Sequence, residues 1–125
     1  MAEDFDTTHW PTELRLKTAE RRLEIAFDTG ERFSLPAELL RVESPSAEVK
    51  GHSARQKQIV AGKAQVGIVA VEPVGRYAVR IRFDDGHDTG IFSWRYLYEL
   101  GSRQAELWDA YLRALAERGL SRDPD

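Results

Sequence analysis

Alternation of apolar and polar residues with a period of two dominates the first third of this chain, whereas helical periodicity is strongest at its end. Residues 14–17 and 22–27 both alternate in this way, as expected for strands with one buried face. A short turn at 28–30 carries a glycine, and the alternation resumes at 32–35. The sequence therefore predicts a β-hairpin over residues 22–35, with another strand before it.

Two more strands are expected in the middle of the chain. Residues 65–71 form a run rich in β-branched side chains, and a turn at 73–75 leads to residues 77–83. In this second run the odd-numbered positions are apolar, whereas Arg80 and Arg82 lie on the opposite face. One face should therefore pack in the core, and the other should face solvent.

Helical signals mostly follow the strands. A short helix is predicted over residues 37–41, and Ser93 can cap a second helix that should stop at Gly101. The final helix is predicted over residues 104–118. Its expected apolar stripe consists of Leu107, Trp108, Tyr111, Leu112 and Leu115.

The order of these elements predicts the fold class. Strands come first and helices mostly last, without βαβ alternation, so we expect an α+β domain in two layers: an antiparallel or mixed β-sheet covered on one face by C-terminal helices. The 125 residues are the usual size of one domain. We place it at 10–119, between flexible tails at 1–9 and 120–125.

The chain contains no cysteine. This excludes disulfides, thiol nucleophiles and thiolate ligands for zinc or iron–sulfur clusters. The N-terminal residues lack the basic and apolar regions of a secretory signal, and no apolar run approaches the roughly 20 residues of a membrane helix. We therefore expect a cytoplasmic protein without membrane contact.

Charge is distributed unevenly, with a basic middle between acidic flanks and a net charge of −3. The stretch 50–63 contains no aromatic residue that could stack on a base, and the isoelectric point is near 5.7, so nucleic-acid binding is disfavoured. A solvated face is the simpler interpretation of the basic residues, and our leading functional hypothesis uses them as a contact surface for a protein partner. The expected contact residues lie in the irregular stretch 42–63 and on the polar strand face: Lys50, His52, Arg55, Lys57, Arg80 and Arg82.

Three carboxylates and a histidine lie together in the turn after residue 83. Oxygen and imidazole ligands of this kind can hold a divalent metal, although the spacing fits neither a calcium loop nor an iron facial triad. A solvated tight turn is the simpler interpretation. The candidate metal ligands are Asp84, Asp85, His87 and Asp88, with His52 as a further candidate.

Several unusual segments together carry a family resemblance. They are Trp10–Leu14, LPAELLRVESPSAEVKGH at 35–52, VEPVGRYAVRIRFDDGHDTGIFSW at 71–94 and YLYELG at 96–101. These segments resemble a bacterial family of small domains, DUF971, that is similar to the N-terminal domain of gamma-butyrobetaine hydroxylase. In that enzyme the domain precedes a separate iron and 2-oxoglutarate-dependent catalytic domain, so the resemblance implies a domain without catalytic activity of its own.

The resemblance also implies something about zinc. In the hydroxylase a structural zinc is held by a Cys-x-Cys-x-x-Cys run after the short helix and by a later histidine. The corresponding positions here are Ser44, Ser46, Val49 and His87. Neutral hydroxyls are poor zinc ligands and valine is none, so we expect the chain to fold without zinc.

Related domains are also joined to ATPases that carry iron–sulfur clusters, which implies an accessory role in iron or iron–sulfur metabolism. Our leading hypothesis is a non-catalytic interaction module acting through an unknown protein partner. The alternative is a metal-binding protein, with iron as a possible cofactor, that uses Asp84–Asp88. An enzyme acting on a small substrate would need a pocket with clustered titratable groups.

Overall fold

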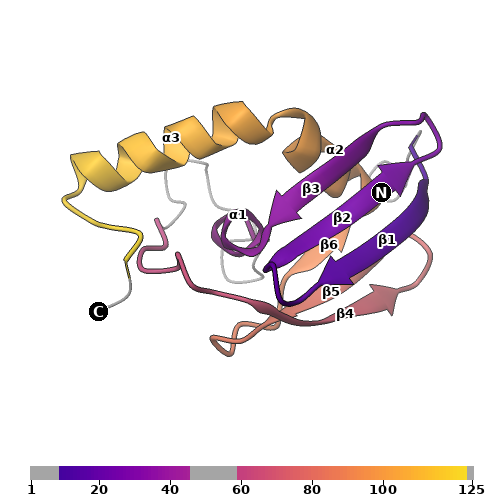
Figure 1. The fold of residues 1–125 in the computed structure, drawn as a ribbon, viewed down its shortest axis with the longest axis horizontal. Coiled ribbons are helices and arrows are strands. Elements are labelled where there is room, and N and C mark those ends of the chain that lie inside the picture. Colours follow the sequence, from indigo (N-terminus) through magenta and orange to yellow (C-terminus); the bar gives the residue numbers. More distant parts are fainter. Residues whose placement is uncertain (1–8, 46–58, 124–125) are drawn as a thin grey trace.

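The computed structural model describes residues 9–45 and 59–123 (Figure 1). Within them, three strands and a short helix precede three further strands and two helices. The elements are β1 (Pro11–Lys17), β2 (Arg22–Phe27), β3 (Arg32–Pro36), α1 (Ala37–Val42), β4 (Ile68–Val74), β5 (Ala78–Phe83), β6 (Ile91–Ser93), α2 (Trp94–Ser102) and α3 (Gln104–Glu117).

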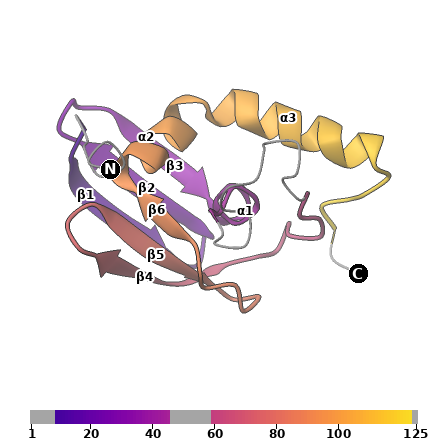
Figure 2. The same cartoon turned by 180° about the vertical axis from the view of Figure 1, so that it is seen from behind.

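The strands form two antiparallel sheets, one in the order β1-β2-β3 and the other in the order β4-β5-β6. In the first sheet Leu23 pairs with Leu35, as the predicted hairpin requires. In the second, Val79 pairs with Phe92. The predicted α+β class is confirmed, and the strands divide between two sheets that the views from opposite sides show next to each other (Figures 1 and 2).

One hydrophobic core joins both sheets to α1 and α2. Leu23 and Phe27 reach it from β2, Val79 and Ile81 from β5, and Leu97 from α2. The predicted alternation along β5 is confirmed, because Val79, Ile81 and Phe83 are buried and the two arginines between them are exposed. The core thus fixes which face of β5 meets solvent.

The predicted end of α2 is wrong by one residue, because Gly101 does not adopt the positive φ with which a glycine ends a helix. Gly101 does not stop the helix, which continues to Ser102. A Cβ atom built on Gly101 would lie 2.3 Å from the Phe33 ring. The glycine therefore serves close packing of α2 against β3.

The expected stripe on α3 needs one correction. Tyr111 and Leu115 are buried against Val42, but Leu112 is 38% exposed. In both views α3 lies beside α1, and much of its length extends beyond the sheets (Figures 1 and 2). Only a narrow apolar stripe is therefore covered.

The backbone after α3 hydrogen bonds to the segment before β4. The Gly62 amide donates to the Ser121 carbonyl, and the Ala64 amide donates to the Arg122 carbonyl, both at 2.9 Å. Two residues of the segment that we expected to be a flexible tail thus contact the domain. In the described part of the chain, no helix is long and apolar enough to cross a membrane.

Candidate functional site

The structure brings Ser44 and His87 together, two of the four positions that the family resemblance assigns to zinc. Ser44 follows α1, where the Tyr96 hydroxyl donates a hydrogen bond to the carbonyl of Glu43. His87 follows the turn after β5, in which Gly86 has a φ of +93°. Ser44 Oγ and His87 Nε2 lie 3.0 Å apart, at hydrogen-bond distance. The structure thus places these two residues in direct contact, although they are 43 positions apart.

These two residues do not fit a tetrahedral zinc site. A neutral hydroxyl is a poor zinc ligand, and the 3.0 Å between Ser44 Oγ and His87 Nε2 is the distance of a hydrogen bond. The Ser44 hydroxyl packs directly against Gly90. A Cβ atom at Gly90 would lie 2.0 Å from Ser44 Oγ, so only glycine leaves room for this hydroxyl. Ser46 and Val49 lie outside the described residues.

Asp85 is held by two cationic side chains. Arg41 Nε donates to its Oδ2 at 2.8 Å, Lys63 Nζ donates to the same oxygen at 2.6 Å, and the His87 amide donates to Oδ1 at 3.1 Å. Partial burial raises the pKa of Asp85, but the hydrogen bonds from Lys63, His87 and Arg41 outweigh it and lower the pKa to about 2. Asp85 is therefore an ionised link between α1, the segment before β4 and the turn after β5.

The other candidate metal ligands do not join Asp85 in a donor set. The Asp84 amide donates to the Gly67 carbonyl at 2.9 Å, and Asp88 is exposed. Over residues 9–45 and 59–123, no three histidine, aspartate or glutamate side chains are arranged to hold a metal ion. His52 lies outside this part of the chain.

The predicted basic face is present on the outer side of the second sheet. Arg80 and Arg82 on β5 are 48% and 47% exposed, and both contact Glu72 on β4. Arg80 Nη2 donates to Glu72 Oε1 at 2.8 Å, whereas Arg82 Nη1 lies 3.5 Å from Glu72 Oε2. The hydrogen bond from Arg80 lowers the pKa of Glu72. Lys50, His52, Arg55 and Lys57, the other expected contact residues, lie outside the described residues.

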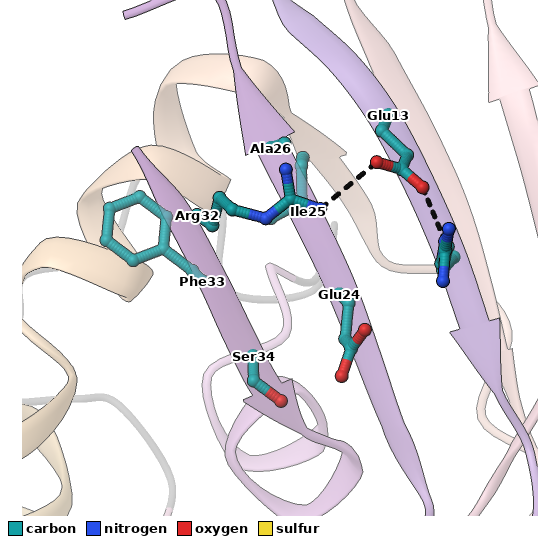
Figure 3. A pocket seen from close by; sticks show the side chains of 8 residues that line it. Glu13, Glu24, Ile25, Ala26, Arg32, Phe33 and Ser34 are labelled. Atoms are coloured by element: carbon teal, nitrogen blue, oxygen red, sulfur yellow. Dashed lines mark hydrogen bonds and ion pairs between the residues drawn. The ribbon is translucent and has the colours of Figure 1, made fainter. Parts of the chain in front are cut away.

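A small hollow of about 210 Å³ lies on the outer face of the first sheet. Glu13 forms ion pairs with Arg15 and Arg32. Figure 3 shows the side chain of Arg32 pointing toward Glu13. Ser34 lines the hollow as well, and its hydroxyl is buried without a hydrogen-bond partner. The charges here neutralise one another, so this hollow offers little to a charged ligand.

A larger cleft, about 650 Å³, lies between α1 and the junction of α2 with α3. Glu38 and Trp108 line it, together with Arg122 from the segment after α3. Sequence reasoning missed this cleft. Glu38 and Arg122 are 84 positions apart, and neither stands in a recognisable motif, so no local signal joins them.

The fold and these surfaces define a small α+β domain, in which the described residues present charged and apolar surfaces and no group of three side chains arranged to hold a metal ion. The gamma-butyrobetaine hydroxylase-like N-terminal family matches residues 14–98. The chain therefore belongs to this family, as the resemblance predicted.

Solved structures agree with this assignment. A crystal structure of a protein of unknown function from Acidithiobacillus ferrooxidans ATCC 23270, a member of the DUF971 family, is 44% identical; the match covers 73% of this chain and 91% of that one, with a TM-score of 0.62. Two proteins solved by NMR in solution match 95% of this chain. One is 48% identical over 94% of its own length with a TM-score of 0.84, and the other is 51% identical over 89% with a TM-score of 0.82. No curated protein matches the chain.

Proposed function

We propose that this chain is a non-catalytic interaction module whose basic sheet face binds an acidic surface of a partner protein in the cytoplasm. The basic sheet face consists of Arg80, Arg82, Val69 and Ile91 around Glu72. The observation that carries the proposal is the exposure of Arg80 and Arg82 side by side, sharing the carboxylate of Glu72.

The two arginines differ in how far Glu72 occupies them. Arg80 donates to Glu72 through two nitrogens, at 2.8 and 3.2 Å, and the charge of Asp88 also acts on it. Arg82 makes only a contact of 3.5 Å with Glu72. A guanidinium carries five N–H donors, so Arg82 keeps the greater capacity to bind a carboxylate from outside.

Apolar side chains lie close to these charges. Val69 and Ile91 are both exposed, and Ile91 is the register partner of Arg80. An arginine beside apolar side chains is the composition favoured at protein interfaces, where burial of the apolar area stabilises the complex and charge complementarity orients it. A protein surface with aspartate or glutamate side chains is the partner that this face would fit.

The proposal also concerns the process in which the partner acts. The resemblance to domains joined to iron–sulfur ATPases supports a partner in iron or iron–sulfur metabolism. This chain would act there without thiolate ligands, because it contains no cysteine. It would also fold without zinc, an expectation that the contact between Ser44 and His87 supports.

The test is quantitative capture of partners from the native cell, followed by binding of the purified partner at increasing salt concentration. The double variant Arg80→Glu/Arg82→Glu should lose the partner. Arg15→Glu/Arg113→Glu carries the same change in net charge away from this face and should retain it. Capture that is equal in both variants, or affinity that does not fall with salt, would contradict the proposal.

A single substitution sharpens this test. Glu72→Gln removes the carboxylate that competes for both arginines, so it should strengthen binding to an acidic partner. Weaker binding by this variant would show that the partner contacts Glu72 itself, and the proposed charge complementarity would then be wrong.

A further inference from the structure

We propose that Glu38 and Trp108 form a guanidinium-binding site for an arginine side chain of a partner protein, and that Arg122 occupies this site in the isolated domain. The site lies in the cleft between α1 and the junction of α2 with α3. It shares no residue with the basic sheet face, so the two proposals stand or fall separately.

Arg122 shows what the site recognises. Its Nε donates to Glu38 Oε2 at 2.9 Å, and its Nη2 donates to Glu38 Oε1 at 2.8 Å. Its Cζ lies 5.2 Å from the centre of the Trp108 ring. A bidentate carboxylate and an aromatic face together suit a planar guanidinium better than an ammonium ion.

The burial of Glu38 favours a cation beside its carboxylate. It is 7% exposed, and it is the only charged residue that is buried between residues 9 and 45 or 59 and 123. A buried carboxylate without a partner is strongly unfavourable, so removal of Arg122 leaves a site that gains from any guanidinium able to reach it. Arg122 itself is 45% exposed, so it can be exchanged without opening the core.

The cleft beside this pair offers room for the residues that flank an incoming arginine. Pro36, Leu39, Ala105 and Trp108 line its apolar part. The segment that carries Arg122 is held by two backbone hydrogen bonds from Gly62 and Ala64. These bonds involve the backbone only, so the Arg122 guanidinium can leave Glu38 while they persist. An incoming arginine then restores the ion pair, and the residues beside it gain apolar contact in the cleft.

The direct test uses Arg122→Ala, with Nα-acetyl-arginine amide as the probe and the citrulline and lysine amides as controls. The arginine amide should raise the Tm of this variant, and the uncharged citrulline amide should bind at least about tenfold more weakly. The control variant Arg113→Ala removes an exposed arginine on α3 but keeps Arg122 in the site, so its rise in Tm should be clearly smaller at the same concentration. Equal effects of the arginine and citrulline amides would overturn the proposal.

A second variant assigns the effect to Glu38. The arginine amide should no longer raise the Tm when Glu38→Gln is added to Arg122→Ala. A rise that persists in the double variant would place the binding elsewhere and would overturn the site.

The unsubstituted chain tests the proposal even if Arg122→Ala does not fold. In NMR titrations the arginine amide at millimolar concentration should shift the indole N–H signal of Trp108 and leave that of Trp94 in place. No shift, or an equal shift with the citrulline amide, would overturn the site. A concentration-dependent dimer that Glu38→Gln abolishes would show that the arginine comes from a second copy of this chain. That result would overturn the proposal of a different partner protein.

Discussion

Ser44 Oγ lies 3.0 Å from His87 Nε2, and this contact joins the end of α1 to the turn after β5. We predict that the fold does not depend on a metal, because a hydrogen bond between two side chains already joins these two segments. Thermal unfolding should remain cooperative in a chelator, with an unchanged Tm. Unfolding caused by the chelator would contradict the prediction.

The same contact predicts a modest loss of stability on substitution. Ser44→Ala leaves a partly buried imidazole nitrogen without this partner and should lower the free energy of unfolding by about 1 kcal/mol in chemical denaturation. Ser102→Ala is a suitable control, because that serine is exposed on α2 and should change stability by less than about 0.5 kcal/mol. A similar loss in both variants would show that the contact with His87 contributes nothing.

Asp85 predicts how stability depends on pH. The pKa of its carboxyl is lowered from 3.8 to about 2 in the folded chain, so its contribution is present above pH 4 and is lost as the pH falls toward 2. The side chain is 18% exposed, and Asp85→Asn should therefore cost about 1 to 2 kcal/mol at neutral pH. The measurement is denaturant unfolding of both proteins from pH 7 to pH 2.

The pH profile distinguishes this ion pair from a structural effect of the substitution. The difference in stability between wild type and Asp85→Asn should shrink steadily as the pH falls from 4 to 2, where about half of the folded chains carry a protonated Asp85. Asp88→Asn, in the same turn but exposed, should follow the wild-type profile within about 0.5 kcal/mol. A difference that is constant with pH would exclude the ionised carboxylate as its source.

The strands were the most predictable part of this molecule. Period-two alternation located the hairpin of β2 and β3 and the outward direction of Arg80 and Arg82, because a sheet with one buried face imposes that pattern directly. The start of β4 was less predictable, since Val66 and Gly67 are buried ahead of the strand that begins at Ile68. A continuous apolar run shows burial but does not show where hydrogen bonding begins.

The contacts between distant elements were not predictable from local patterns. Asp85 was expected as a metal ligand or a solvated residue, yet it meets Arg41, which is 44 positions away. Arg122 was expected in a flexible tail, yet it meets Glu38. Pairs of this kind depend on how the packed elements place their ends, and one sequence without an alignment carries no signal for them.

The pair of Glu38 and Arg122 predicts non-additive effects on stability. Arg122→Ala leaves the carboxylate of Glu38 unpaired and should destabilise the fold by about 1 to 3 kcal/mol, because Glu38 is only 7% exposed whereas Arg122 is 45% exposed. The double variant Glu38→Gln/Arg122→Ala has no buried charge and should be more stable than Arg122→Ala alone. Urea unfolding of the two single variants and the double variant gives the coupling, and strictly additive losses would contradict the ion pair.

Gly101 gives the strictest test of how α2 packs on β3. Alanine is the better helix former by roughly 1 kcal/mol, so helix propensity alone predicts that Gly101→Ala stabilises the domain. The structure predicts the reverse, because the new Cβ atom would lie 2.3 Å from the Phe33 ring and would push the helix away from the sheet. We expect a net loss of about 1 to 3 kcal/mol in chemical denaturation. Adding Phe33→Leu removes the ring and should recover part of this loss, whereas a gain in stability from Gly101→Ala alone would show that the helix is not packed this closely.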